Sequence, residues 1–377
     1  MAVESFKLSA NHKSERILVF RIGQIGDTVA ALPSLWALRQ QFLEARILIL
    51  NEVPAKETHL PPETVLPQTG LVDGFVKYPG GASVKHFFTA WRQIRQLRKQ
   101  GFDTLVYLTP SGRTKKQRLR DQMFFRLCGI KRFLATKGFA ENLRPRLPDG
   151  TLATLPREAD ALLERLKLDG LPVPAAGEGC MDLRITETER AKVNNWWRQN
   201  AGTQPLPNGW VAVCTGGKLT SKLWPWERYA EVVRLLMEKH GLFPVIIGGD
   251  EDREVGERLL SQWGIGLCAA GELSVRESAA LIERAQFYLG NDTGVMHLAA
   301  AVGRPCVAIF SARDWPGIWE PYGSGHKVLR FDVPCSGCRL AVCDRELQCL
   351  RGIEVQQVYE ACVHLLHRPQ PELAAHS

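Results

Sequence analysis

Residues 289–310, LGNDTGVMHLAAAVGRPCVAIF, decide the fold that we expect for this chain. The preceding run QFYL is typical of a buried strand, a Gly-Asn turn follows it, and Asp292 or Thr293 can cap a helix that runs to Gly303. A second strand, CVAIF, completes the unit. Such a turn gathers free backbone N–H groups at the positive end of a helix dipole, which attracts an anion such as a phosphate. The alternative is an ordinary strand-turn-helix unit in which the aspartate is only a cap.

Strands and helices alternate along the rest of the chain. The expected strands are residues 16–20, 46–50, 102–108, 209–215, 243–249 and 286–290. The segment 169–179, DGLPVPAAGEG, is the predicted linker, because it is rich in Pro, Gly and Ala. This alternation in two halves predicts an α/β protein with two doubly wound parallel sheets that face a central cleft. The predicted domains are residues 1–170 and 171–352, and a final helix and tail, 353–377, could pack back on the first domain.

The composition favours a soluble globular protein. Of the 377 residues, 45% are hydrophobic and 23% are charged. No apolar run approaches the roughly 18 residues of a membrane span, and the N-terminal residues lack the apolar core of a signal peptide. We therefore expect a cytoplasmic protein whose ten cysteines are mainly reduced.

Positive charge is concentrated in the first half. Residues 1–150 hold 24 Lys and Arg against 12 Asp and Glu, a net charge of +12, and the remainder holds 24 against 28, a net charge of −4. This split suggests that the first half meets a polyanion, either a phosphorylated glycan, an anionic membrane surface or nucleic acid. A solvated basic surface without a partner is the alternative.

Two basic segments carry much of this charge. The predicted helix over 85–100 places Phe87, Trp91, Ile94 and Leu97 on one face, which favours packing on the sheet over contact with anionic lipid. The next segment, 111–139, follows a strand end and could line a cleft. Its basic side chains there are Arg113, Lys115, Lys116, Arg118 and Arg120.

Polar residues follow the predicted strands where each one ends. Asp27 lies in the first such turn, as a helix cap or as a candidate general base. Gly23 and Gly26 do not complete the dinucleotide fingerprint, which argues against a nicotinamide site. In the second half three loops should converge, because loops after parallel strands open on the same edge. They supply Lys218 and Lys222 as cations, the amides of Asp292 to Gly294 as donors, and Glu251 or Asp252 as acceptors for sugar hydroxyls.

Four cysteines lie close together near the C-terminus. Cys335, Cys338, Cys343 and Cys349 have the spacing C-x2-C-x4-C-x5-C, which admits a zinc or iron–sulfur site. All four crowd one segment with no histidine close by. Structural thiols or an adventitious disulfide are therefore the preferred interpretation, and no metal is expected.

The chain resembles glycosyltransferase family 9, the ADP-heptose:lipopolysaccharide heptosyltransferases. The matching pieces lie in the family's order: RIGQIGDTVAALPSLWALR, the KLWP that begins at Lys222, IIGG followed by acids, NDTGVMHLAAAVGRP, the WEPYG that begins at Trp319, and the cysteine-rich stretch. The resemblance implies the GT-B architecture, in which two Rossmann-like domains hold the acceptor in the first half and the nucleotide sugar in the second. Ala31, Lys218 and the sequence FSARDW depart from the usual pattern, which leaves the sugar open.

The resemblance also implies a mechanism, an inverting and metal-independent single displacement without a cofactor. Asp27 would remove the proton from an acceptor hydroxyl, and Lys222 with the amides of Thr293 and Gly294 would stabilise the leaving diphosphate. His297 would touch the donor, or is a capping or core histidine instead. The implied donor-binding set is Lys218, Glu251, Asp252, Leu273, Asp292, Thr293, Gly294 and His297, and the basic segment 113–120 would bind the acceptor.

The leading hypothesis is therefore transfer of a heptose from an ADP-activated donor to the lipopolysaccharide inner core, an anionic glycolipid, with peripheral contact at the inner face of the membrane. Another sugar or acceptor glycan is the alternative within the family. A non-catalytic nucleotide-sugar-binding protein is a second hypothesis. A nucleic-acid binder is a third, but no recognition motif supports it and we expect no nucleic-acid partner.

Overall fold

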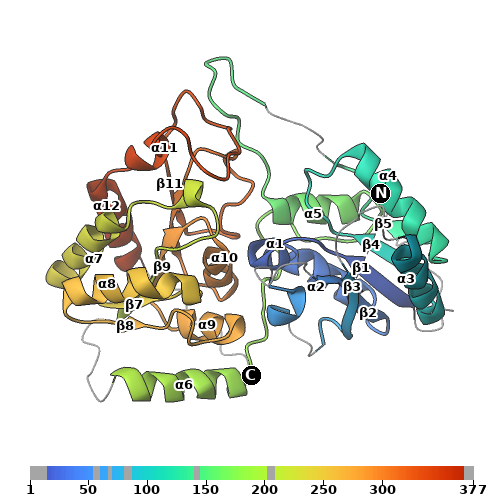
Figure 1. Ribbon diagram of the computed structural model, residues 1–377, viewed down its shortest axis with the longest axis horizontal. Coiled ribbons are helices and arrows are strands. Elements are labelled where there is room, and N and C mark those ends of the chain that lie inside the picture. Colours follow the sequence, from blue (N-terminus) through green and yellow to red (C-terminus); the bar gives the residue numbers. More distant parts are fainter. Residues whose placement is uncertain are drawn as a thin grey trace, which may run out of the picture.

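The computed structural model describes residues 15–53, 60–66, 70–79, 87–139, 145–201 and 209–368. In this part of the chain two α/β domains lie side by side, each built on one sheet (Figure 1). Every strand pairing described in the two sheets is parallel. The expected fold class, α/β with two doubly wound parallel sheets, is confirmed.

The first sheet has the strand order β3-β2-β1-β4-β5. Its strands are β1 (Arg16–Phe20), β2 (Arg46–Val53), β3 (Gly74–Pro79), β4 (Thr104–Tyr107) and β5 (Arg132–Leu134). The helices of this domain are α1 (Ile25–Ala30), α2 (Leu32–Gln41), α3 (Phe87–Gln100), α4 (Lys115–Leu127) and α5 (Glu158–Lys167), with a 3-10 turn, η1 (Pro62–Thr64). All four residues of β4 are buried, because apolar side chains on both of its faces meet helices.

The second sheet has the order β11-β10-β9-β6-β7-β8. Its strands are β6 (Trp210–Cys214), β7 (Phe243–Ile246), β8 (Leu267–Cys268), β9 (Phe287–Asn291), β10 (Cys306–Phe310) and β11 (Lys327–Arg330). Its helices are α6 (Glu187–Ala201), α7 (Trp226–His240), α8 (Arg253–Trp263), α9 (Val275–Ile282), α10 (Gly294–Ala301), α11 (Gln348–Arg351) and α12 (Val355–Leu366), with the 3-10 turns η3 (Thr220–Lys222) and η4 (Asp250–Asp252). In both sheets the first strand of the domain is central, and the order in which the strands are added reverses beside it, at the point where open α/β sheets bind ligands.

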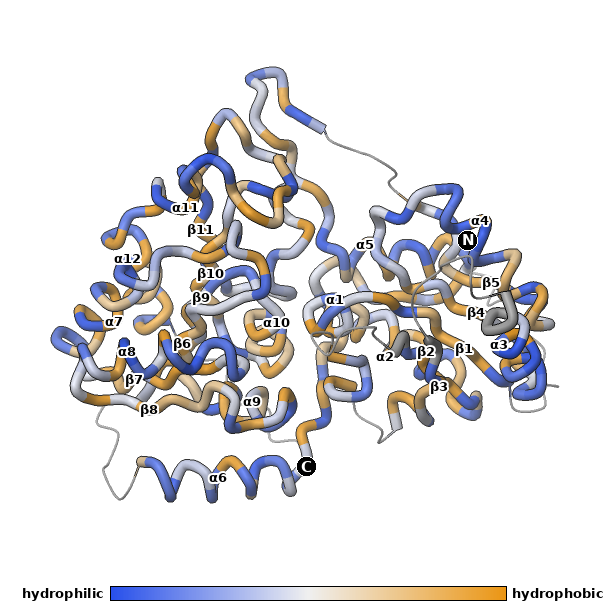
Figure 2. Tube along the Cα trace, in the orientation of Figure 1, coloured by the Kyte–Doolittle hydropathy of each residue, from blue (hydrophilic) through white to orange (hydrophobic). Residues whose placement is uncertain are grey.

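Apolar side chains fill both faces of each sheet, and the strands and the inner sides of the helices are the most hydrophobic segments (Figure 2). One cluster crosses between the domains, since Leu298 of α10 and Ala279 of α9 pack with the apolar residues of α1 and α2. No helix in the described ranges is long and apolar enough to cross a bilayer.

The structure corrects several details of the sequence prediction. The expected single helix after β1 is broken at Ala31 into α1 and α2. Helix α12 packs on α7, β9 and β10 of the second domain, so its suggested return to the first domain is wrong. Trp91 of α3 is 52% exposed, whereas Leu97 packs in the core as expected. The side chain of Phe87 lies outside the described residues, as does the tail from residue 369.

Candidate functional site

The two domains meet where β1 and β9 end. Helix α1 follows β1, α10 follows β9, and the two helices pack against each other. Glycines allow the close approach: a Cβ added at Gly26 would lie 2.8 Å from the His297 ring, and one added at Gly294 would lie 2.8 Å from Ile25. The first turn of each helix is thus brought to one place, together with the polar residues that the sequence predicts there.

Asp27 lies on this junction with both carboxylate oxygens engaged. Its Oδ2 accepts a hydrogen bond from the Gln24 amide at 2.8 Å, and its Oδ1 lies 3.3 Å from the Arg21 guanidinium. Asp27 is the third residue of α1 and closes a capping box with Gln24, so it caps the helix from inside the first turn. The side chain remains 19% exposed. The capping and chemical interpretations of Asp27 are therefore compatible.

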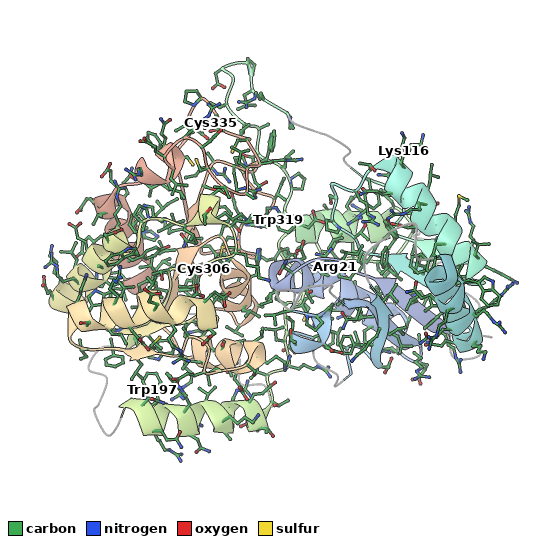
Figure 3. The ribbon with its side chains drawn as sticks, viewed as in Figure 1. Arg21, Lys116, Trp197, Cys306, Trp319 and Cys335 are labelled. Carbon is green, nitrogen blue, oxygen red and sulfur yellow. The ribbon has the colours of Figure 1, made fainter. Side chains whose placement is uncertain are left out.

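A buried charged network supports Arg21, which the sequence analysis missed. Arg21 donates to the Leu108 carbonyl at 2.7 Å and is 3% exposed (Figure 3). Burial lowers the pKa of Arg21 from its ordinary value, and the negative charges of Asp27 and Glu158 oppose this. Glu158 lies 3.8 Å from Arg165, and both are buried. Arg21 could have been noticed in the sequence as a cation that directly follows a buried strand.

On the other side of the junction, Lys222 pairs with Asp292. The Lys222 Nζ lies 2.5 Å from Asp292 Oδ2, and both side chains are largely buried. Burial lowers the pKa of His297 from its ordinary value of 6.5; Lys222 lowers it further, whereas Asp292 and Asp27 raise it. The lowered pKa favours the neutral imidazole, which lies near charged groups of both domains. Its ring also packs edge-on at 6.4 Å from Trp319, which lies at the domain junction (Figure 3).

Thr293 and Gly294 are half-buried at the start of α10. Thr293 is the N-cap residue, and its side chain makes no capping hydrogen bond. Of the two expected capping residues, Asp292 and Thr293, Thr293 therefore occupies the N-cap position, whereas the Asp292 carboxylate is bound to Lys222. The first amides of α10 point toward the junction end of the helix, where the helix dipole is positive.

Asn291 ties the converging loops together, a role that sequence analysis did not assign. Its Oδ1 accepts hydrogen bonds from the Trp224 amide at 3.0 Å and the Tyr229 hydroxyl at 2.9 Å. Its Nδ2 donates to the carbonyls of Thr215 and Gly216, at 2.8 and 3.4 Å. Asn291 is fully buried. The amide thus links the loop after β6, the segment after Lys222 and the end of β9.

The remaining predicted donor residues lie on the loops after β6, β7 and β8. Lys218 donates a hydrogen bond to the Gln24 side chain across the junction, and burial lowers its pKa while nearby Glu251 raises it. Asp252 accepts from the Gly249 amide at 2.9 Å, and burial raises its pKa to about 6. Leu273 packs half-buried against the second-domain core.

The basic residues of segment 113–120 do not all face the junction. Arg113 donates to the Asp121 carboxylate and to the Tyr107 hydroxyl, in a largely buried pair. Arg118 stacks over Phe139 at 4.4 Å, and Arg120 reaches the same Asp121. Lys115 and Lys116 are exposed, and Lys116 lies at the outer end of the domain, away from Arg21 (Figure 3). A role for all five in one acceptor site stays a prediction.

The four clustered cysteines line one small cavity. Cys335, Cys338, Cys343 and Cys349 surround it together with Ser221 and Arg313. All ten cysteines are free thiols, and in the described ranges no three His, Cys, Asp or Glu side chains are arranged to hold a metal ion. The cysteine-rich segment holds the turn that carries Lys222 in place. The neighbouring residue, Ser221, donates hydrogen bonds from its amide and its hydroxyl to the carbonyls of Ala341 and Leu340, respectively.

Comparison with known proteins agrees with this arrangement. Residues 175–348 match the model of glycosyltransferase family 9 (heptosyltransferase). Lipopolysaccharide heptosyltransferase 2 of Escherichia coli K12 is 28% identical over 157 residues, which cover 40% of this chain and 42% of that protein. The chain thus spans less than half the length of this curated relative.

Solved structures cover nearly the whole chain. A glycosyl transferase family 9 protein from Veillonella parvula superposes with a TM-score of 0.68 and 19% identity, covering 93% of this chain and 97% of that one. The E. coli ADP-heptose lipopolysaccharide heptosyltransferase II superposes with a TM-score of 0.64 and 21% identity, covering 93% and 98%. At these identities the superpositions establish the fold of both domains.

Proposed function

Because residues 175–348 of this chain belong to glycosyltransferase family 9, we propose that the protein is an inverting, metal-independent glycosyltransferase. The donor is an ADP-activated heptose, and the acceptor is an anionic glycolipid, the lipopolysaccharide inner core. The enzyme works in the cytoplasm, at the inner face of the membrane that carries the acceptor.

One observation carries the proposal: helix α1, which holds Asp27, packs against α10, so that Gly26 lies against the His297 ring and the Lys222–Asp292 pair lies beside the start of the same helix α10. A carboxylate from one domain and a cation beside a helix N-terminus from the other are the groups that a displacement at an anomeric carbon needs.

Asp27 is the general base in this proposal. Its carboxylate takes the proton of the acceptor hydroxyl, whose oxygen attacks the anomeric carbon as the bond from that carbon to the diphosphate oxygen breaks. Arg21 holds the carboxylate in place through the 3.3 Å contact. The diphosphate leaves on the opposite face with the bonding electron pair, so the configuration inverts.

The second domain stabilises the leaving group. In this proposal the Lys222 ammonium group donates a hydrogen bond to a phosphate oxygen while it keeps part of its contact with Asp292. The amides of Thr293 and Gly294 donate hydrogen bonds to another phosphate oxygen. A neutral His297 can donate or accept one hydrogen bond to the donor without adding charge. Lys218 adds positive charge, Glu251 and Asp252 offer acceptors for sugar hydroxyls, and Leu273 borders the base.

The proposal is tested by incubating the protein with ADP-heptose and a heptose-deficient lipopolysaccharide core and measuring the mass of the core. A mass gain of one heptose per core supports it. Thermal shifts with ADP, UDP and GDP show which nucleotide the second domain prefers, and a preference for UDP or GDP would point to another sugar. Binding of ADP-heptose without any transfer would favour the second candidate, a non-catalytic nucleotide-sugar-binding protein.

A further inference from the structure

We propose that the outer faces of α3 and α4 form a surface that docks on an anionic phospholipid bilayer. This α3–α4 surface is made up of Trp91, Lys116, Leu119, Arg120, Met123 and Leu127.

The solvent-facing side of α4 is unusually apolar. Asp121 and Phe125 mark its buried side. The opposite side, at helical spacing, carries Lys116, Leu119, Arg120, Met123 and Leu127. Leu119, Met123 and Leu127 are 51%, 64% and 58% exposed, respectively. A helix on a soluble domain normally presents polar side chains to water, so these three side chains on one line mark an interaction surface.

The charge around this line has one sign. Residues 91–131 contain eleven Lys and Arg and two Asp, with no Glu. One of the two acids, Asp121, is buried and paired with Arg113. The exposed surface is thus cationic, with large apolar side chains between the cations. Lysine and arginine can reach lipid phosphates while leucine, methionine and tryptophan enter the region below them.

Helix α3 extends the same surface. It packs against α4, and the two helices lie together at the edge of the first domain that is farthest from the second domain (Figure 1). Trp91 is 52% exposed, and the Arg95 guanidinium stacks over its ring at 4.5 Å. An exposed tryptophan beside cations is typical of the membrane interface, because the ring is amphipathic.

Charge complementarity selects the bilayer among the other partners. A second copy of the chain that docked through the same surface would bring Lys116 and Arg120 against equally cationic helices. A nucleic acid would satisfy the cations but would leave three apolar side chains in water. Anionic phospholipid satisfies both. The biological purpose of this contact rests on the proposed function, since docking would hold the enzyme on the membrane that carries its acceptor.

The experiment is co-sedimentation of the full-length protein with phosphatidylcholine vesicles, with and without phosphatidylglycerol. We expect binding to the mixed vesicles that weakens as salt is raised. The triple variant Leu119→Ser/Met123→Ser/Leu127→Ser should bind about tenfold more weakly, because its charge is unchanged but its apolar contact is lost. A matched control, Leu43→Ser/Ile265→Ser/Val342→Ser, removes equally large exposed side chains elsewhere (71%, 45% and 71% exposed) and should bind like the wild type.

Equal vesicle binding by the triple variant and the wild type would overturn the inference, provided that thermal unfolding shows both to be folded. So would the absence of wild-type binding, or binding of random duplex DNA in its place. The assay contains no donor and no acceptor, so failure of the proposed transfer leaves its result intact. Conversely, the triple variant should transfer sugar to a lipid-free acceptor at the wild-type rate, which separates docking from catalysis.

Discussion

The Arg21 guanidinium lies 3.3 Å from the Asp27 carboxylate, and the two residues stand on either side of the turn that joins β1 to α1. Arg21 is 2% exposed at its side chain and Asp27 is 19% exposed. The arginine is therefore a fixed buried support, and the aspartate is the member of the pair that a substrate can reach. Asp27 owes its position to a partner six residues earlier in the chain.

Replacing Arg21 by Met should destabilise the protein by about 3 kcal/mol, because Asp27 and Glu158 lose their shared cation in a buried setting. Urea unfolding measures this change. Arg21→Lys should recover part of the stability but less of the activity, since an ammonium group cannot hold both the Leu108 carbonyl and the carboxylate in the same geometry. Wild-type kcat in Arg21→Lys would rule out a positioning role for the guanidinium.

Replacing Lys222 by Met should lower kcat by about 10²-fold, the usual effect of removing one group that stabilises developing negative charge. Steady-state kinetics with ADP-heptose measures it. Asp292→Asn is the matched control: it removes the partner that competes for Lys222, so the affinity for ADP should rise or stay constant. If Lys222→Met left kcat unchanged, Lys222 would have no part in leaving-group stabilisation.

Replacing Asn291 by Leu should lower the free energy of unfolding by about 3 kcal/mol or more, because several buried polar groups lose their hydrogen-bond partners at once. Chemical denaturation gives the value. ADP affinity should fall as well, since Asn291 joins the loop after β6 to the segment after Lys222. A stable variant with normal ADP binding would show that these loops hold their positions without the amide.

The free energy of unfolding should depend on pH because the pKa of Asp252 is raised in the folded protein. Burial raises its pKa from 3.8 to about 6, so the folded protein holds this proton more tightly than the unfolded chain does. The resulting stabilisation is complete below pH 3.8 and is lost as the pH rises through about 6. Melting temperatures between pH 4 and pH 7.5 should show this loss in the wild type and a smaller one in Asp252→Asn, which can still accept from Gly249. Parallel pH profiles for the two proteins would refute the assignment.

The sequence predicted the architecture well because buried parallel strands leave a strong signal. The runs at 16–20, 209–215 and 286–290 each correspond to a central strand. The four edge strands β3, β5, β8 and β11 were missed; β5, β8 and β11 have only two to four residues, mostly partly exposed, and so show no clear apolar pattern. The Lys222–Asp292 pair and the contact of Gly26 with His297 join residues far apart in the chain, and no local pattern predicts which of them meet.

Contacts between side chains also decide what the cations of the basic segment 113–120 do. The sequence shows five cations on one stretch, but it does not show that Arg113 pairs with Asp121 or that Arg118 stacks on Phe139. It also favoured packing for the face that carries Phe87, Trp91, Ile94 and Leu97, whereas Trp91 is exposed; among the described side chains of that face, Ile94 and Leu97 pack in the core.

The most direct test of the account is the rate of heptose transfer by Asp27→Asn, measured in a single turnover with ADP-heptose and a heptose-deficient core. Asparagine keeps the size and the acceptor for the Gln24 amide but cannot take a proton, so the rate should fall by about 10³-fold while ADP affinity stays within a few-fold of the wild type. Transfer at the wild-type rate would contradict the central claim that Asp27 is the general base.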